Sequence, residues 1–276
     1  MKRIATVQDL SCVGKCSLSI ALPVLSAMGV ECCVIPTAVL SAHTAFDGFV
    51  SRDLTDLLAP VSAHWQQLGL TFDALYTGYL ASPAQVDFVE AFFDRFGGEH
   101  TLRFVDPVMA DQGRLYAGFD DGFPEKMRRL CARADIITPN ITEACLLTGT
   151  LYREQHDEDY VRALLEKLLA FGPRTVILTG VRPADGRMGV AAMDASDEMS
   201  VHLTEYIPAV FHGTGDLFAS ACVGYLTLGR STAEAIRRAS EYVVRTLRVT
   251  AQNPDARWYG VDFETTLPLL WEKEEA

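Results

Sequence analysis

The alternation of short apolar runs with longer helical patterns constrains the fold most. The strand-like runs lie at 3–8, 32–40, 74–80, 102–108, 135–140 and 175–180. The helical patterns lie at 15–29, 53–69, 84–96, 122–133 and 157–171. Strands that alternate with helices predict a mainly parallel sheet covered on both faces. We therefore expect an α/β fold.

The pattern changes in the last third of the chain. Residues 186–207 are typical of two strands joined by a polar turn, Ala-Ser-Asp-Glu, which predicts an antiparallel hairpin. Two long helices are expected next, at about 214–228 and 232–252. Because no internal repeat, low-complexity tract or linker interrupts the pattern, we expect one domain over 1–276.

Composition excludes several classes of function. The formal charge is −12 and no block rich in Lys or Arg is present, which argues against nucleic acid and anionic membranes as partners. No stretch approaches the roughly 20 apolar residues of a membrane span, and the first residues do not form a signal peptide. Seven scattered cysteines without a Cys-x-x-Cys pair argue against disulfides or a zinc cluster. We expect a cytoplasmic protein.

Polar residues that follow the strand-like runs are the candidates for a binding site. In parallel sheets, ligands bind in the loops at the carboxyl ends of the strands. His43 is one such residue, although a single histidine is more often packed or hydrogen-bonded than catalytic. The full set is Asp9, Ser11, Ser41, His43, Thr44, Thr77, Tyr79, Asp106, Asn140, Glu143 and Thr179.

The stretch His-Gly-Thr-Gly-Asp, which ends at Asp216, precedes the first of the two long helices. Unpaired N–H groups and the helix dipole attract anions to a helix N-terminus, and glycines allow a phosphate to approach. The stretch could therefore hold a phosphoryl group during its transfer. Alternatively, Asp216 only stabilises the helix start, by about 1 kcal/mol. The motif alone leaves both interpretations open.

Two common nucleotide-binding motifs are absent from the candidate loops. A dinucleotide fingerprint on the glycine stretch would need glycine where Phe218 stands. A Walker A loop around "DLSCVGKC" would need glycine in place of Asp9 and Ser or Thr in place of Cys16.

Asn140 and Glu143 have the spacing of a helix capping box, and capping is the favoured interpretation of the spacing alone. The alternative is an amide and a carboxylate that hold Mg²⁺ through its waters beside nucleotide phosphates. Asp106 follows a strand and precedes a proline. It is either an ordinary strand terminus or a second acidic group near the same metal.

Six segments in order give the chain a family resemblance. They are VQDLSCVGKCSLSIALPVLSAMGVE, PTAVLSAHTAF, YTGYLASPAQV, VDPVMADQGRLY, ITPNITEACLLTG and HGTGDLFAS. Together they resemble the ribokinase-like superfamily, and within it the vitamin B6 (pyridoxal and pyridoxamine) kinases. The resemblance implies a three-layer sandwich without a large lid, Mg²⁺ with ATP as cofactor and a homodimer. It leaves a monovalent cation as an open option.

The resemblance also implies a role for each candidate residue in phosphorylating the 5′-hydroxymethyl group of a B6 vitamer. Asp216 would be the catalytic base. The anion hole around the transferred phosphoryl group would be formed by Gly213, Thr214 and Gly215. The nucleotide side would be formed by Asn140, Thr179, Val210 and Phe211. The metal side would be formed by Asp106 and Glu143. The substrate side would be formed by Asp9, Ser11, Thr44 and Tyr79.

The sequence departs from the family pattern in two places. Ala42 replaces the asparagine of a Ser-Asn-His-Thr motif, and "QDLSCVG" is shorter than the usual loop. The preferred vitamer therefore stays open. A hydroxymethylpyrimidine kinase is the nearest alternative, although Asp216 favours the B6 branch because the related enzymes often have cysteine there. A catalytically silent nucleotide- or pyridoxal-phosphate-binding module is the second alternative.

The expected place of Asp216 at a helix N-terminus also predicts its acidity. A helix N-terminus stabilises the anionic form of a carboxyl group, so we expect Asp216 to be ionised and a weak base.

Overall fold

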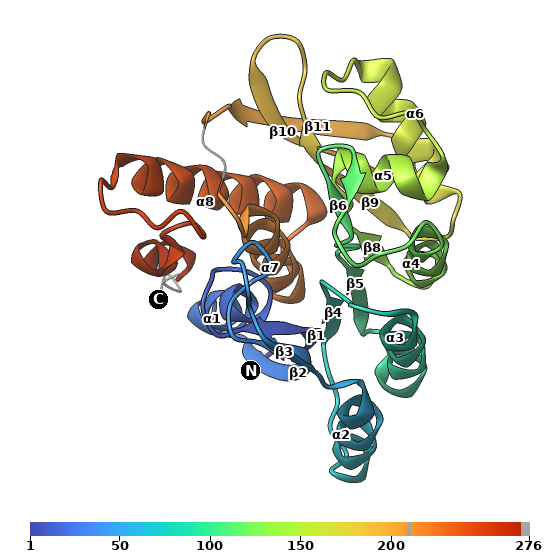
Figure 1. Ribbon diagram of the computed structural model, residues 1–276. Coiled ribbons are helices and arrows are strands. Elements are labelled where there is room, and N and C mark those ends of the chain that lie inside the picture. The colour runs from blue at the N-terminus through green and yellow to red at the C-terminus, as the bar shows by residue number, and fades with distance from the viewer. Residues whose placement is uncertain (209–210, 272–276) are drawn as a thin grey trace, which may run out of the picture.

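A computed structural model describes residues 1–208 and 211–271. At the centre of this described part is a nine-stranded sheet, in the order β11-β10-β9-β8-β5-β4-β1-β2-β3 (Figure 1). The strands are β1 (Arg3–Ser11), β2 (Glu31–Leu40), β3 (Ser51–Asp53), β4 (Ala74–Thr77), β5 (Leu102–Val105), β8 (Ile136–Ile137), β9 (Thr175–Val181), β10 (Arg187–Asp194) and β11 (Met199–Glu205).

Strand directions confirm the predicted α/β class. From β9 across to β2 every neighbouring pair is parallel. The two ends of the sheet are antiparallel: β3 pairs with β2, and the β10–β11 hairpin pairs with β9. The hairpin expected at 186–207, with its turn at 195–198, is therefore confirmed.

Three short strands were not predicted from the sequence. Besides the edge strand β3, these are β6 (Ala110–Asp111) and β7 (Arg114–Leu115), which form a small separate hairpin. Its two turn residues, Gln112 and Gly113, both have positive φ angles, 50° and 77°. Positive φ at both central positions is the geometry of a tight two-residue hairpin turn. Gln-Gly is a weaker signal for this turn than Asn-Gly.

The helices form a layer on each face of the sheet. On one face α1 packs against α7, and α7 packs against α8; α3 to α6 cover the other face (Figure 1). The helices are α1 (Leu18–Ala27), α2 (Thr55–Gln67), α3 (Pro83–Phe96), α4 (Phe123–Cys131), α5 (Ile141–Thr148), α6 (Glu158–Leu169), α7 (Thr214–Thr227) and α8 (Thr232–Gln252), followed by the 3₁₀ turns η1 (Phe263–Thr265) and η2 (Leu267–Leu270).

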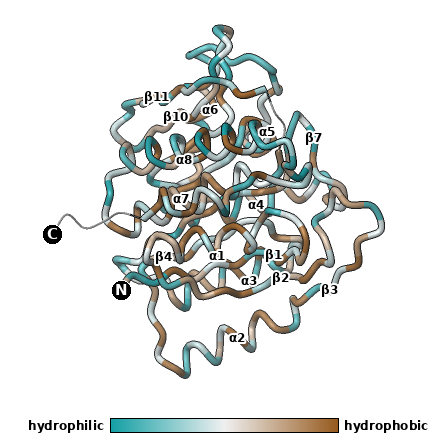
Figure 2. Tube along the Cα trace, turned by 90° about the vertical axis from the view of Figure 1, so that its left-hand side faces the viewer, coloured by the Kyte–Doolittle hydropathy of each residue, from teal (hydrophilic) through white to brown (hydrophobic). Residues whose placement is uncertain are grey.

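Each helical layer shares an apolar core with one face of the sheet. Successive side chains of a strand point to opposite faces, so Ile4 packs with α1 and α7, whereas Ala5 packs with the layer opposite. Figure 2 shows α7 as largely hydrophobic, whereas α8 alternates between hydrophilic and hydrophobic residues. The helix that carries Asp216 is thus enclosed between the sheet and α8.

One helix starts later than the sequence pattern predicts. The helical pattern begins at residue 15, but α1 begins at Leu18. Ser17 precedes it with φ of 48°, in the left-handed region that a non-glycine residue rarely adopts. Residues 12–17 are therefore a loop, named here the β1–α1 loop.

None of the helices in the described part of the chain combines the length and the hydropathy needed to cross a bilayer. All seven cysteines are free.

Candidate active site

The carboxyl ends of the parallel strands bring the candidate residues to one edge of the sheet. Asp9 lies in β1, Asp106 directly follows β5, and Asn140 follows β8. A cleft of about 480 Å³ opens at this edge, between the sheet and the start of α7. The predicted residues that line it are Asp106, Asn140, Glu143, Thr179, Phe211, Gly213, Thr214, Gly215 and Asp216.

Gly213 forms the turn into α7. Its φ is 85°, and a Cβ atom at this position would lie 2.1 Å from the backbone oxygen of Lys15. Only glycine satisfies both constraints. A Cβ atom on Gly215, by contrast, would meet nothing within 4 Å, so the space in front of this turn is open. The first N–H groups of α7 have no partner within the helix, and together they form a site suited to an anion.

Asp216 lies in the first turn of α7, as the motif predicted, but its acidity differs from the expectation. Burial, together with the smaller contribution of the Asp9 charge, raises the pKa of Asp216 to about 7, while the backbone N–H of Ser17 opposes the shift. The expectation of a weakly basic carboxylate is therefore wrong. Loss of solvation outweighs the helix N-terminus at this position.

Asn140 and Glu143 form the capping box that their spacing predicted. The Asn140 side-chain oxygen accepts the Glu143 N–H at 2.9 Å, and Glu143 Oε2 accepts the Asn140 N–H at 2.9 Å. Glu143 Oε1 also accepts the Met109 N–H at 3.1 Å, and Asn140 Nδ2 donates to the Ala110 carbonyl at 2.8 Å. The box therefore stabilises the start of α5 and holds the β6–β7 hairpin beside the cleft.

The two predicted metal residues form a crowded acidic pair. Burial raises the pKa of Asp106 well above its usual range, and the charges of Glu143 and Asp216 raise it further. Burial also raises the pKa of Glu143 to about 8, although backbone N–H groups oppose the shift. A divalent cation between these carboxyl groups would relieve both the repulsion and the cost of burial.

A metal site built from protein side chains alone does not fit the arrangement. Within residues 1–208 and 211–271, no three His, Cys, Asp or Glu side chains are close enough together to hold an ion. The buried hydroxyl of Thr77, at the end of β4, has no hydrogen-bond partner and is free to bind an ordered water. Mg²⁺ commonly keeps several waters and uses one or two carboxylates, so the donor set fits a hydrated Mg²⁺.

The predicted substrate residues fall into two groups. Asp9 and Ser11 are buried, with a hydrogen bond of 3.4 Å from Ser11 Oγ to Asp9 Oδ2. Burial raises the pKa of Asp9, against hydrogen bonds from Ser17 and Ser11. Burial also raises the pKa of Tyr79, with a further contribution from the charge of Asp9. These three residues therefore gather near Asp216, whereas Thr44 is exposed on the loop after β2.

The predicted nucleotide residues in the described part of the chain line the cleft. The Thr179 N–H donates to the Pro139 carbonyl at 2.9 Å, and Thr179 forms a parallel bridge with Asn140, which places both at the cleft edge. Phe211 also lines the cleft. Val210 lies outside the described residues.

Sequence reasoning missed residues that complete the cleft. Tyr116 and Gln112, from the β6–β7 hairpin, line it together with Met188 and Tyr206. Burial raises the pKa of Tyr116, and the charge of Glu143 contributes. The position of Tyr116 in the family segment VDPVMADQGRLY was an available signal. His43 is buried, and its Nε2 lies 3.1 Å from the Tyr259 carbonyl, so it is a packed histidine.

Comparison with known proteins gives consistent relatives. A model of the phosphomethylpyrimidine kinase family matches residues 21–259. The pyridoxal kinase PdxY of Rubrobacter xylanophilus is 30% identical over 260 residues, which cover 90% of this chain and 87% of that protein. The match extends over nearly the same region as the sequence resemblance.

Two solved structures have the same architecture. A candidate phosphomethylpyrimidine kinase from Bacteroides thetaiotaomicron, crystallised with pyridoxal, is 38% identical with a TM-score of 0.93; the alignment covers 98% of this chain and 95% of that one. The pyridoxal kinase of Leishmania donovani in complex with ADP and pyridoxamine is 19% identical with a TM-score of 0.85, over 98% and 96% of the two chains. The second likeness shows the fold alone.

Proposed function

The chain belongs to the phosphomethylpyrimidine kinase family, together with pyridoxal kinases, and from this premise we propose that it phosphorylates a B6 vitamer. The γ-phosphoryl group of ATP would pass to the 5′-hydroxymethyl group of pyridoxal, pyridoxine or pyridoxamine. The family match and the pyridoxal kinase relative confirm the predicted B6-kinase family and the predicted enzyme class, a phosphotransferase.

The state of Asp216 is the observation that carries the proposal. It is a half-buried carboxyl group that lines an open cleft, at the N-terminal end of a helix, and its pKa is raised to about 7. A carboxylate with such a pKa accepts a proton from an alcohol more readily than an ordinary aspartate does. A residue that only stabilised the helix start would not need to face the cleft.

The transfer follows from this arrangement. The Asp216 carboxylate accepts the proton of the hydroxymethyl group while its oxygen bonds to the γ-phosphorus, and the bond from the γ-phosphorus to the bridging oxygen of ADP breaks. The N–H groups of Thr214 and Gly215 stabilise the negative charge on the phosphoryl oxygens. Gly213 permits the turn that directs these groups into the cleft.

When bound, Mg²⁺ would supply positive charge that neutralises the nucleotide phosphates. Asp106 and Glu143 would hold it, with water between at least some of the oxygens, and Asn140 would keep Glu143 in place. A nucleotide phosphate chain along the cleft would lie beside Thr179 and Phe211, with Val210 assigned to the same side by family resemblance.

On the vitamer side, Asp9, Ser11 and Tyr79 would contact substituents of the pyridine ring, because they gather next to Asp216. Thr44 would reach the ring if the loop after β2 closes. These assignments are tested by the Michaelis constants of the three vitamers in single-residue variants.

The proposal extends to the organisation of the protein. The described strands β1–β5 and β8–β11 form one sheet, which supports a single kinase domain over 1–276. A homodimer and a monovalent cation are added to the proposal by family resemblance, and a cytoplasmic location is added from the cysteine pattern. Light scattering of the purified protein, and activity in K⁺ against Na⁺ buffers, test the first two.

The test is an enzyme-coupled assay of ADP release with the three vitamers, hydroxymethylpyrimidine and ribose, in wild type and Asp216→Asn. We expect turnover with at least one vitamer, a 5′-phosphate product by mass spectrometry, and loss of turnover in the variant. Turnover with hydroxymethylpyrimidine alone would make the protein a thiamine-pathway kinase instead. Binding of ATP and pyridoxal without turnover would identify a silent binding module.

A further inference from the structure

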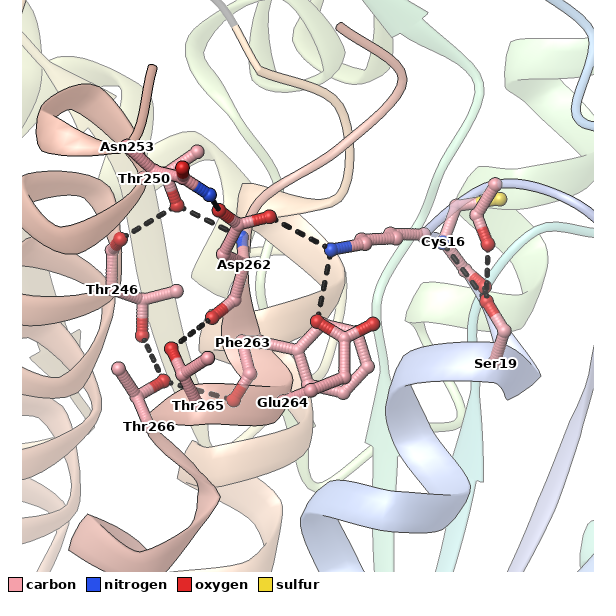
Figure 3. Close-up of polar contacts among 12 residues, drawn as sticks. Cys16, Ser19, Thr246, Thr250, Asn253, Asp262, Phe263, Glu264, Thr265 and Thr266 are labelled. Carbon is pink, nitrogen blue, oxygen red and sulfur yellow. Dashed lines mark hydrogen bonds and ion pairs between the residues drawn. The ribbon is translucent and has the colours of Figure 1, made fainter. Parts of the chain in front are cut away.

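Lys15 connects the β1–α1 loop to the C-terminal segment of the chain. Its Nζ lies 3.1 Å from Asp262 Oδ1 and 2.9 Å from Glu264 Oε2, across 247 and 249 residues of sequence (Figure 3). The side chains of Lys15 and Asp262 are only 14% and 12% exposed, whereas that of Glu264 is 54% exposed. The ion pair with Asp262 is therefore largely shielded from solvent, and the Lys15 ammonium group is bound within it.

The C-terminal side of this ion pair is firmly anchored. Asp262 accepts a hydrogen bond of 2.7 Å from Asn253, and its own N–H donates to the Thr250 hydroxyl of α8 at 2.8 Å (Figure 3). Gly260 lies against the stem of Lys15, where a Cβ atom would approach Lys15 Cβ to 2.4 Å. The segment therefore provides a fixed support for the lysine, tied to α8.

The β1–α1 loop contacts the reacting end of α7 at two points. The Lys15 carbonyl packs against Gly213, and two residues later the Ser17 N–H lies close enough to the Asp216 carboxyl group to lower its pKa. The Ser17 side chain lies close enough to Asp9 to lower the pKa of that carboxyl group. One short loop thus touches the anion hole, the base and a substrate residue.

Ser17 makes these contacts in a conformation that needs support. Its φ of 48° and ψ of −129° lie outside the usual regions for a residue with a side chain. Such strain persists only where the surroundings hold the residue in place. The loop has no regular structure of its own between β1 and α1. Its first half is held by two backbone hydrogen bonds, from the Cys12 N–H to the Leu40 carbonyl and from the His43 N–H to the Val13 carbonyl. The anchored side chain of Lys15 holds the second half, next to Ser17.

We propose that the Lys15–Asp262 ion pair is a positioning device for phosphoryl transfer. It holds the β1–α1 loop so that the Ser17 N–H meets the Asp216 carboxylate and the Lys15 carbonyl supports the Gly213 turn. Lys15 is a positioning residue and not a phosphate ligand, because its ammonium group is bound to two carboxylates. The inference deepens the proposed kinase function and rests on it.

The variant pair Lys15→Met with Asp262→Asn tests the inference. Replacing both partners avoids a stranded buried charge, so the fold should keep its stability. We expect kcat to fall by about tenfold or more, since a small misplacement of reacting groups is costly, while the KM values for MgATP and vitamer stay within about threefold. Lys15→Arg keeps a cation and should retain most of kcat.

A matched control is Arg129→Met, which breaks a surface ion pair between α4 and α3 and should change neither constant. A double variant with kcat within twofold of wild type would overturn the inference. A fall in kcat that is explained by a lower melting temperature of the double variant would also overturn it. The same holds if kcat falls as far in Lys15→Arg as in the double variant.

A second readout does not depend on turnover. In hydrogen–deuterium exchange, peptides that span 12–20 and 211–218 should exchange faster in the double variant, while peptides from α3 and α4 stay unchanged. Unchanged exchange at both segments would refute the positioning role even if the wild type is active. Faster exchange with a wild type that phosphorylates nothing would refute the proposed function but keep the link between loop and C-terminal segment.

Discussion

Two regions of the molecule bury acidic side chains, and they differ in how the charge is compensated. In the cleft, Asp106 and Glu143 are buried and Asp216 is half-buried, and in the described part of the chain none of them forms an ion pair with Lys or Arg. At the C-terminal segment, Asp262 is also buried but is bound by Lys15 and Asn253. The pKa values are raised in the first region and lowered in the second.

The difference in compensation distinguishes carboxyl groups that take part in the reaction from one that holds the structure. A buried carboxyl group without a cation is costly to keep, and such groups gather where a ligand or a proton transfer uses them. Asp262 does not have this cost. Burial raises its pKa, but hydrogen bonds from Asn253 and Lys15 lower the pKa by more. Its role is to fix a loop, not to react.

The largest effect is expected from the uncompensated carboxylate that takes the proton. Asp216→Asn removes the base but keeps the shape of the turn, so kcat should fall by about 10²–10⁴-fold. Steady-state kinetics with pyridoxal and MgATP measure it, with Asp87→Asn, an exposed surface carboxylate, as control. A variant within threefold of wild type would show that Asp216 only stabilises α7.

The metal side should show the next largest effect. Asp106→Asn removes one charge from the acidic pair, and apparent affinity for Mg²⁺ should fall by about 10–100-fold. The measurement is activity against free Mg²⁺ at saturating ATP and vitamer. An unchanged Mg²⁺ dependence would remove Asp106 from the metal site.

The raised pKa of Asp216 predicts a pH profile. The base is active when deprotonated, so kcat/KM should rise about tenfold per pH unit below its pKa and level off near 7. Pyridoxine and pyridoxamine ionise differently from each other. Their pH profiles should nevertheless rise over the same acidic range of pH. A rise whose midpoint pH changes with the substrate would show ionisation of the vitamer and not of Asp216.

Stability should change in opposite directions in the two regions. The raised pKa of Asp216 means that its contribution to stability is present below its ordinary pKa and is lost as pH rises towards 7. Asp216→Asn should therefore stabilise the protein at pH 8, by at most about 4 kcal/mol, and hardly at pH 4. The lowered pKa of Asp262 means that its contribution is present at neutral pH and is lost in acid.

Asp262→Asn should accordingly lower the unfolding midpoint at pH 7 and have less effect in strong acid. Denaturant titration of both variants across this pH range measures the two slopes. Slopes of the same sign would contradict the contrast between the two regions.

Local patterns in the sequence predicted what depends on neighbouring residues. The alternation of strands and helices predicted the sheet, the spacing of Asn140 and Glu143 predicted the capping box, and the glycines before Asp216 predicted the start of α7. Family resemblance added the B6-kinase assignment. These features can be predicted because they depend on residues close together in the sequence or on a set of motifs in a fixed order.

What the sequence did not predict depends on distant contacts. The raised pKa of Asp216 comes from burial and from Asp9, which is far away in the chain and next to it in space. The sequence excluded a Walker A loop at Lys15 but offered no partner for that lysine, because Asp262 lies 247 residues further on. No periodicity encodes a pairing of that length.

The long separation between Lys15 and Asp262 also bears on the order of folding. Contacts between residues far apart in the sequence close large loops and form late. β1 can pair with β2 and β4 as soon as about the first third of the chain is available, whereas the support for the Ser17 turn requires α8 and the segment after it. A ribosome-bound chain could thus hold most of its sheet and still have an unsupported β1–α1 loop, so catalytic competence should arrive as one of the last events of synthesis.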